Sequence, residues 1–282
     1  MKIGFCMLLW TTMVDESHKA ILEDIKATGY DGVEIPVMGG TPDDYAQIGQ
    51  MLDSIGLDRE AITVLPTLEQ NPLSDEASTR QGAVDYLKWS LECTEALGGT
   101  QIAGPLHSTL GHFTGSPPSE TERSRATEFH QKVGDIASAK KLTIMLEAIN
   151  RFECYFANTM EDLCAHVARV DHPAIKAMYD TFHANIEEAD PIAAYTSNAG
   201  HVRHIHISEN DRGVPGRGHI PFAETIAAIK GTGYDGWLTI EAFGRGLPEL
   251  AAATRVWRDF SENPEAVYRE GYKTIRDSWD AA

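Results

Sequence analysis

Hydrophobic residues along this chain form short runs that alternate with longer amphipathic stretches. Eight runs are nearly continuous in hydrophobicity and rich in β-branched residues, which is typical of parallel strands buried on both faces. The eight runs are Lys2–Leu9, Gly32–Val37, Ala61–Leu65, Thr100–Ala103, Leu142–Glu147, Ile175–Asp180, Val202–Ile207 and Trp237–Glu241. The stretches between them show helical spacing, as in Ala83, Leu87 and Leu91, where an apolar residue recurs every fourth position. The pattern therefore predicts repeated strand–helix units.

A short internal repeat indicates that equivalent units stand near both ends of the chain. The segment that begins Ile25-Lys-Ala-Thr-Gly-Tyr-Asp-Gly reappears as Ile229-Lys-Gly-Thr-Gly-Tyr-Asp-Gly. In each copy a glycine able to adopt the left-handed conformation would end a helix, and an Asp-Gly turn would lead into a strand. We therefore predict an α/β fold of the (β/α)₈ TIM-barrel type. An open doubly wound sheet is the alternative, although no Gly-rich dinucleotide loop follows the first run.

Domain organisation follows from the absence of a linker rich in Pro, Gly or Ser. Residues 1–282 are expected to form a single (β/α)₈ barrel domain with a C-terminal helical extension. The most loop-like stretch follows the fourth run, over residues 106–119, and would cover one face of the barrel.

Charge and cysteine content narrow the function. The chain has 42 acidic residues against 24 Lys plus Arg, a formal charge of −18, which repels nucleic-acid phosphates and anionic lipids. The four cysteines form no CxxC pair. The opening apolar run has no cleavage site after it, and no run reaches the ~18 residues of a membrane span. We expect a soluble, cytoplasmic protein that binds neither nucleic acid nor membrane.

Four polar residues stand at the ends of the last four runs: Glu147, Asp180, His206 and Glu241. The carboxyl ends of barrel strands meet on one face, which carries the active site in this fold. For any one of these residues, a solvated strand end or a hydrogen-bonded core histidine is an ordinary explanation. Three carboxylates and an imidazole on successive strands instead predict a shared divalent cation, with Mn²⁺, Co²⁺ or Mg²⁺ suiting the oxygen-rich set.

Further polar residues follow these strand ends. Glu153, His183 and Arg212 lie in the following loops. Taken alone, Glu153 could be an exposed loop charge, His183 a residue in the first turn of a helix, and Arg212 an ion-pair partner of a nearby acidic residue. Glu34 lies within the second run and is expected to point to the same face, either as support for the site or as an ordinary structural residue.

Four segments carry a resemblance to a known family: Leu146-Glu-Ala-Ile-Asn-Arg-Phe-Glu, Asp180-Thr-Phe-His-Ala-Asn-Ile-Glu-Glu, His204-Ile-His-Ile-Ser-Glu-Asn-Asp-Arg and Thr239-Ile-Glu-Ala-Phe. They resemble the ketose 3-epimerases, that is, the D-tagatose and D-psicose 3-epimerases of the xylose-isomerase-like barrel superfamily. The likeness extends over nearly the whole chain in organisation and is most specific from about residue 142 to 243.

The resemblance implies roles for individual residues. Glu147, Asp180, His206 and Glu241 would hold the metal, commonly Mn²⁺, and Glu147 and Glu241 would be the proton-transfer pair. Epimerisation at C3 removes a proton on one face and restores it on the other, through an enediolate that the metal stabilises.

The resemblance also implies substrate contacts. Glu153, His183 and Arg212 would bind the O1–O3 end of a small ketose, and the chain would form a homodimer or homotetramer. This chain departs from the family beside the first strand and after the fourth, where Leu8 and His107 would contact the far end of the sugar. The substrate is therefore left open among D-tagatose, D-psicose/D-fructose and L-ribulose types. The absence of a basic cluster favours a free sugar over a phosphate.

Other functions use similar parts. A sugar or sugar-phosphate isomerase, a hydroxypyruvate isomerase or an inosose dehydratase of the same superfamily could use the same four ligands. A DNA-repair endonuclease would need a basic groove that this acidic chain lacks. A non-catalytic sugar-binding barrel would be expected to have lost Glu147 or Glu241, and both are present.

Overall fold

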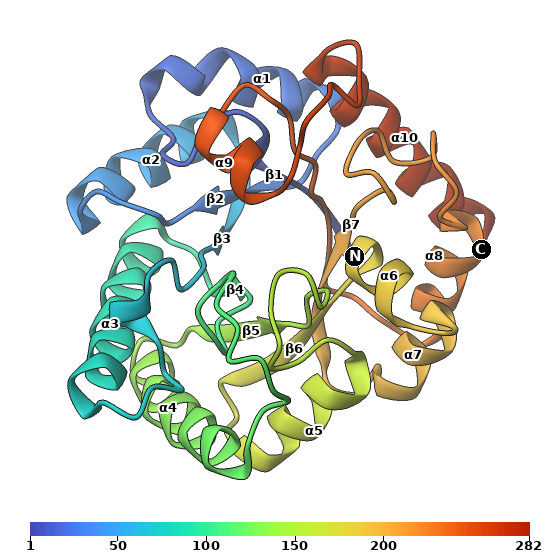
Figure 1. The fold of residues 1–282 in the computed structure, drawn as a ribbon. Coiled ribbons are helices and arrows are strands. Elements are labelled where there is room, and N and C mark those ends of the chain that lie inside the picture. Colours follow the sequence, from blue (N-terminus) through green and yellow to red (C-terminus); the bar gives the residue numbers. More distant parts are fainter.

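The computed structural model describes all residues from 1 to 282 and contains a closed barrel of eight parallel strands, each hydrogen-bonded to its neighbours in chain order (Figure 1). The strands are β1 (Lys2–Cys6), β2 (Gly32–Pro36), β3 (Asp58–Ile62), β4 (Gln101–Gly104), β5 (Thr143–Glu147), β6 (Ile175–Asp180), β7 (Val202–Ile207) and β8 (Trp237–Ile240). The predicted (β/α)₈ barrel is confirmed.

Helices form a ring around the barrel (Figure 1). They are α1 (Lys19–Thr28), α2 (Pro42–Ile55), α3 (Ala77–Leu97), α4 (Glu120–Ala139), α5 (Met160–Val170), α6 (Thr181–Glu187), α7 (Pro191–Asn198), α8 (Phe222–Gly231), α9 (Pro248–Ala253) and α10 (Pro264–Ala281). Short 3₁₀ turns cover Met7–Leu9, Glu16–His18 and Leu68–Gln70. None of the helices is long and apolar enough to span a bilayer.

Two strands, β1 and β3, differ from their predicted bounds by more than one residue. The first ends at Cys6, because Met7–Leu9 turn into a 3₁₀ helix although they are apolar and buried. The third begins at Asp58, three residues before the predicted start, and so includes Glu60. A charged Asp-Arg-Glu sequence hides a strand from hydrophobic pattern, because Glu60 is buried inside the barrel by partners from other strands.

The repeated joint behaves as predicted at both ends of the chain. Gly29 ends α1 with φ of 119° and Gly233 follows α8 with φ of 76°, the left-handed region that glycine enters without steric cost. After the first joint, the Asp31 carboxylate accepts a hydrogen bond from the Ile3 amide at 2.8 Å. This bond ties the turn before β2 to the start of β1.

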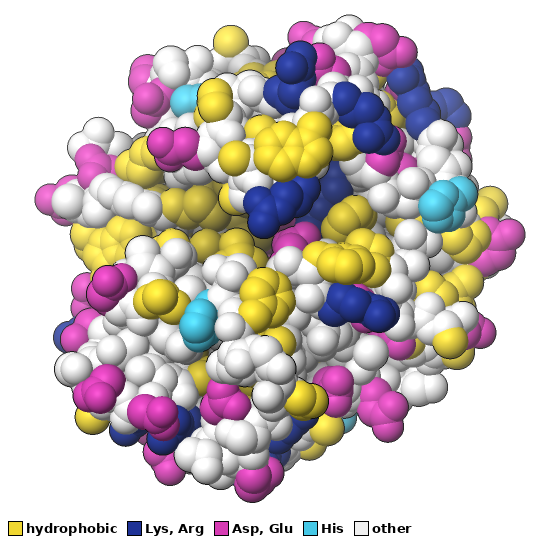
Figure 2. Space-filling view, in the orientation of Figure 1, with side chains coloured by type: hydrophobic (Ala, Val, Ile, Leu, Met, Phe, Trp, Pro, Cys, Tyr) yellow, Lys and Arg dark blue, Asp and Glu magenta, His cyan; other side chains and the backbone are white.

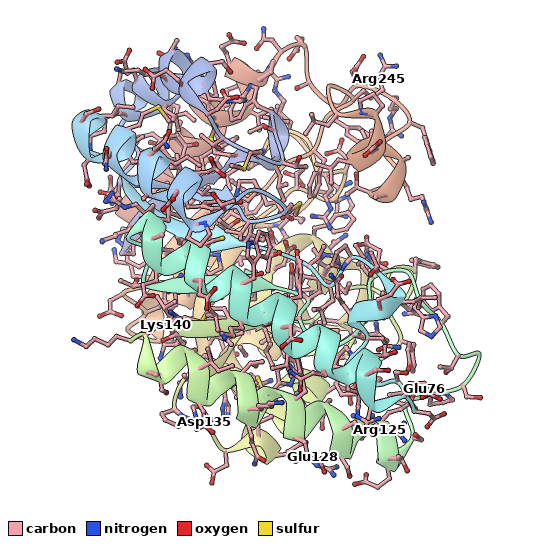
Figure 3. All side chains as sticks on the ribbon, turned by 90° about the vertical axis from the view of Figure 1, so that its left-hand side faces the viewer. Glu76, Arg125, Glu128, Asp135, Lys140 and Arg245 are labelled. Atoms are coloured by element: carbon pink, nitrogen blue, oxygen red, sulfur yellow. The ribbon has the colours of Figure 1, made fainter.

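The main core lies between the outer faces of the strands and the helices. The outward-facing strand side chains join the inner faces of the helices in one cluster of 62 buried residues, which includes Phe5, Val33 and Ile205. Charged side chains lie along α4 and at its C-terminal end, as Arg125, Glu128, Asp135 and Lys140 show in the side view, and Glu76 stands at the N-terminus of α3 (Figure 3). The buried acidic residues are Glu34, Glu60, Glu147, Asp180, Glu209 and Glu241, so most of the acidic excess is at least partly exposed, while apolar residues fill the layer beneath.

Candidate active site

A cavity of about 370 Å³ opens at the carboxyl ends of the strands. In the space-filling view this face is hollowed at its centre, with hydrophobic side chains on one side and charged atoms on the other (Figure 2). The residues lining it are Leu8, Met38, Ile62, Val64, Pro66, Pro105, Leu110, Gly111, Glu147, Ile149, Glu153, His183, Arg212, Glu241, Phe243, Leu250, Ala253, Thr254 and Arg255. The sequence-predicted face of the barrel is thus the hollowed one.

The four strand-end residues converge at the base of this cavity. From His206 Nδ1, the nearest carboxylate oxygens are Asp180 Oδ2 at 3.5 Å, Glu241 Oε2 at 3.7 Å and Glu147 Oε1 at 4.0 Å. Asp180 and His206 are register partners on β6 and β7, while Glu147 ends β5 and Glu241 directly follows β8. All four side chains are buried, so the barrel brings together groups that lie up to 94 residues apart.

Asp180 has two functions because its two oxygens face different partners. Oδ1 caps the N-terminus of α6, accepting from the amides of Phe182 at 2.6 Å and His183 at 3.1 Å. Oδ2 faces His206 and accepts a hydrogen bond from Ser208 Oγ at 3.3 Å. The cap fixes the carboxylate so that its second oxygen points into the cluster.

Electrostatics favour a cation among these groups. His206 Nδ1 and Glu147 Oε1 are buried without a hydrogen-bond partner, although buried polar atoms normally have one. Burial and the negative charge of Glu241 raise the pKa of Glu147 well above its usual value. Burial acts to lower the pKa of His206, but the charges of Glu34 and Glu241 outweigh it and raise that pKa. Three carboxylates and an imidazole nitrogen fit a divalent cation of the Mn²⁺, Co²⁺ or Mg²⁺ type.

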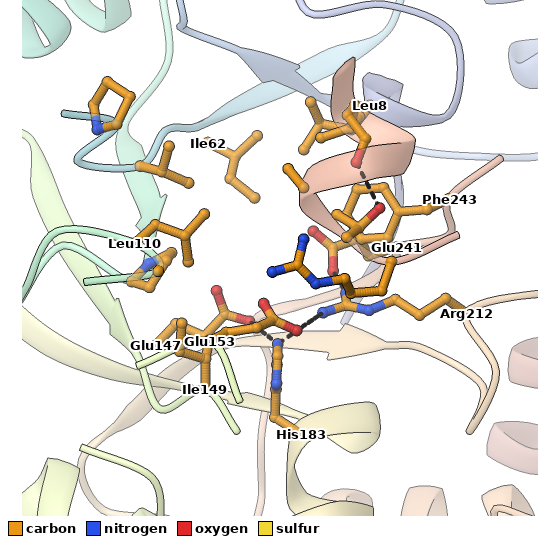
Figure 4. A pocket seen from close by; sticks show the side chains of 18 of the residues that line it. Leu8, Ile62, Leu110, Glu147, Ile149, Glu153, His183, Arg212, Glu241 and Phe243 are labelled. Atoms are coloured by element: carbon orange, nitrogen blue, oxygen red, sulfur yellow. Dashed lines mark hydrogen bonds and ion pairs between the residues drawn. The ribbon is translucent and has the colours of Figure 1, made fainter. Parts of the chain in front are cut away.

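Arg212 crosses the cavity toward the carboxylate cluster (Figure 4). Its guanidinium forms an ion pair with Glu241 Oε2 through Nη1, and its Nη2 lies 2.9 Å from His183 Nε2. The group is held between two aromatic rings, 4.0 Å from the centroid of Phe182 and 4.7 Å from that of Phe243. With φ of 63°, Arg212 also adopts a left-handed backbone that non-glycine residues rarely take. This side chain is therefore fixed in place before any ligand binds.

His183 lies between Asn150 and Arg212. Its Nδ1 accepts the backbone N–H of Asn150 at 3.0 Å, and its Nε2 lies 2.9 Å from Nη2 of the Arg212 guanidinium. Burial and the positive charge of Arg212 lower the pKa of His183 to about 4, which keeps the ring neutral near pH 7. Asn150 Nδ2 also donates to Glu153 Oε1 at 2.8 Å. His183, Arg212 and Glu153 thus form a polar wall beside Glu147.

Sequence reasoning did not assign roles to the residues that hold this wall. Asn150, Phe182 and Phe243 all lie within the family-like segments, and Ser208 follows His206 by two positions. Their neighbours in the chain could have indicated them, but nothing in the residue types distinguishes a supporting asparagine or phenylalanine from an ordinary one.

His107 has a different environment from the predicted one. It is fully buried, does not line the cavity, and donates from Nε2 to the Glu147 backbone carbonyl at 2.8 Å. Its ring stacks on Phe156 with centroids 5.4 Å apart. His107 therefore lies behind the cavity wall, against the backbone of Glu147 and the ring of Phe156. The substrate contact proposed for it stays a prediction.

Comparison with known proteins gives the family. The model of the xylose isomerase-like TIM barrel matches residues 22–278. The chain belongs to this family, among its ketose 3-epimerases. It is 30% identical to the D-psicose 3-epimerase of Ruminiclostridium cellulolyticum, over 94% of this chain and 92% of that protein. It is likewise 30% identical to the L-ribulose 3-epimerase of Methylomonas sp., over 93% and 92% of the two chains.

A solved structure agrees with this assignment. The D-psicose 3-epimerase of Clostridium cellulolyticum H10, crystallised with D-tagatose, matches with a TM-score of 0.89 and 28% identity, covering 99% of this chain and 98% of that one. This member of the ketose 3-epimerase family is therefore an isomerase that acts on sugars, and its barrel carries groups capable of binding a metal.

Proposed function

We propose that this ketose 3-epimerase catalyses the metal-dependent epimerisation of a free ketose at C3. The observation that carries the proposal is the pair of buried, unpartnered atoms, His206 Nδ1 and Glu147 Oε1, facing the carboxylates of Asp180 and Glu241. Such atoms are costly to bury unless a cation satisfies them. The names of the relatives, which include D-psicose and L-ribulose 3-epimerases, support the same reaction.

Glu147, Asp180, His206 and Glu241 would hold the ion, and we propose Mn²⁺ for it. When bound, such an ion supplies positive charge beside the oxygens of C2 and C3 and so stabilises the negative charge that develops there. Cytoplasmic location and homodimeric or homotetrameric assembly stay predictions.

Glu147 and Glu241 are the proposed proton-transfer pair. One carboxylate takes the proton from C3, which leaves a planar enediolate, and the other donates a proton to the opposite face of C3. The two roles exchange when the reaction runs backward, so no net proton is gained or lost. The carboxylates come from β5 and β8, with two strands between them, and this separation supports an approach from different sides.

His183, Arg212 and Glu153 would orient the O1–O3 end of the ketose. The guanidinium of Arg212 is held beside His183, and a donor fixed in advance stabilises a developing negative charge by about 3 kcal/mol. Glu153 adds an acceptor for a hydroxyl group. This arrangement supports recognition of the reacting end of the substrate.

A free ketose suits the opposite end of the cavity better than a phosphate ester. Leu8, Ile62 and Leu110 form this end (Figure 4), and the cavity offers only one cation away from the carboxylates, Arg255. A phosphate group is usually held by several donors. D-Tagatose, D-psicose/D-fructose and L-ribulose are the proposed candidates.

Incubation with Mn²⁺ and each free ketose in D₂O tests the proposal. We expect the C3 epimer to form with deuterium at C3, detected by NMR and mass spectrometry. Formation of an aldose with deuterium at C2 would instead show an aldose–ketose isomerase. Absence of exchange at C3 with every ketohexose and ketopentose would refute the proposed reaction.

A further inference from the structure

A network of buried polar side chains lies in the barrel interior outside the cavity lining. It comprises Glu34 on β2, Glu60 on β3, Gln101 on β4, His204 on β7 and Thr239 on β8. None of these side chains lines the cavity, and Glu34, His204 and Thr239 have no exposed surface. The reaction proposed above uses none of them.

The contacts run in sequence from the candidate metal site into the barrel. Glu34 Oε1 accepts from two imidazoles, His206 Nε2 at 3.2 Å and His204 Nε2 at 3.1 Å. His204 Nδ1 lies 3.3 Å from Glu60 Oε2, which also accepts from Gln101 Nε2 at 2.6 Å. Thr239 Oγ1 donates to the other oxygen of Glu60. Glu34 is thus the residue that joins this polar network to the four converging residues at the strand ends.

Burying two carboxylates and two imidazoles is costly, and apolar side chains could fill the same space. Elsewhere the barrel interior is filled by Ala103, Met145 and Met178, which pack against one another. Stability alone therefore does not explain the ionic groups, because buried ion pairs are often no more stabilising than well-packed apolar residues.

We propose that Glu34 is a positioning residue for His206, and that His204 holds Glu34 in place. Imidazole binds a metal through a nitrogen that carries no proton. By accepting from Nε2, Glu34 fixes the proton there and leaves Nδ1 free, aimed at Asp180, Glu241 and Glu147. A carboxylate in this position also makes the imidazole a stronger ligand. This inference rests on the cation site of the proposed function.

One other arrangement of the same atoms gives a different expectation. Glu34, His204 and His206 lie close enough together to bind a cation of their own. In that case Glu34 would be a ligand of a second ion, and His206 would be shared between two ions. The number of ions bound per chain separates the two arrangements.

The test is titration of the metal-free full-length protein with Mn²⁺, by calorimetry and by electron paramagnetic resonance. We expect one ion per chain in the wild type, binding roughly 10- to 100-fold weaker in Glu34→Gln, and an affinity within about threefold of wild type in Glu60→Gln. Glu60→Gln is the matched control because it changes a buried carboxylate of the same polar network that does not contact His206. With Co²⁺, the visible absorption bands should shift in Glu34→Gln alone.

A second measurement needs no variant to assign the proton. In wild-type protein with ¹⁵N-labelled histidine and bound Mg²⁺, we expect His206 to carry its proton on Nε2, and the proton on Nδ1 would overturn the inference. Wild-type Mn²⁺ affinity and an unchanged Co²⁺ spectrum in Glu34→Gln would also overturn it, while leaving the proposed epimerase intact. Two ions per wild-type chain would replace it with the shared-ion arrangement. A wild type that binds no divalent cation would refute both proposals.

Discussion

The two halves of the barrel differ in what they present to the cavity. The segments at the ends of β5–β8 supply all the charged and imidazole groups of the cavity, together with apolar residues such as Ile149 and Phe243, whereas those of β1–β4 supply only nonpolar residues such as Leu8, Ile62 and Leu110. Both halves are built of the same strand–helix units and close into one ring. Under the proposed function, the reacting groups come from one half, and the other half would accommodate the part of the substrate that does not react.

The polar half is also the more firmly held. Asp180 caps a helix, Arg212 lies between two aromatic rings, and His183 is bonded to the backbone of Asn150. The apolar half contacts a ligand mainly by shape, which places weaker demands on the orientation of each side chain. Changes in the two halves should therefore differ in size and in the kinetic constant that they affect.

The largest effect is expected from the carboxylate pair of the polar half. Glu147→Gln and Glu241→Gln should each lower kcat by about 10³-fold or more, since an amide cannot transfer the C3 proton. Deuterium exchange at C3 measures the same step directly. Glu249→Gln, on an exposed turn of α9, is the control and should leave the rate unchanged. Full activity in Glu241→Gln would disprove its role in proton transfer.

Metal removal should abolish catalytic activity without unfolding the barrel. After chelation we expect activity to fall below about one per cent, because the positive charge beside the reacting oxygens is lost, and Mn²⁺ should restore it. Added Mn²⁺ at about 100 times its Kd should stabilise the fold by about 2.7 kcal/mol. Thermal melting with and without Mn²⁺ measures this shift, and activity that survives exhaustive chelation would contradict the site.

Acid should destabilise the packing of α4 against α5, where the two halves of the barrel meet. His166 Nε2 lies 2.8 Å from His130 Nδ1, and His130 Nε2 donates to the Leu106 carbonyl beyond β4. Burial lowers the pKa of His130 to about 3 and that of His166 to about 2. In the unfolded chain both have pKa near 6.5, so between pH 6.5 and 3 the unfolded state binds more protons and stability falls as pH falls.

The expected loss at pH 5 is about 2 kcal/mol for each of the two histidines, relative to pH 7. Denaturant unfolding of wild type and His166→Leu between pH 7 and 5 should give a shallower slope for the variant. His201→Gln changes an exposed histidine and should keep the wild-type slope. Parallel curves for wild type and His166→Leu would show that this pair does not control acid stability.

The smallest effect is expected in the apolar half. Leu110→Ser should raise KM for a ketohexose by less than about tenfold, since Leu110 is only half-buried and its apolar contact is worth about 1 kcal/mol. The value of kcat should stay within about twofold, because the reacting end is held by the other half. Leu68→Ser alters an exposed leucine outside the cavity and serves as the control. A large fall in kcat would break the proposed division between the halves.

Local patterns along the chain are enough to predict the fold and the four residues at the strand ends. Alternating apolar runs and the repeated helix-Gly-Tyr-Asp-Gly-strand joint are local signals, and a residue at a strand end must lie on the barrel face where the strands end. The proximity of Glu147, Asp180, His206 and Glu241 is therefore predictable from their positions at the ends of the strands.

The surroundings of these four residues depend instead on how the barrel closes. The burial of Glu60 inside a strand that its charges conceal, the contact of Glu34 with His206 across 172 residues, and the place of His107 behind Glu147 all depend on side chains from distant strands. Local pattern cannot report such contacts, because the barrel interior is shared by all eight strands. A charged residue reads as exposed until the partner that buries it is known.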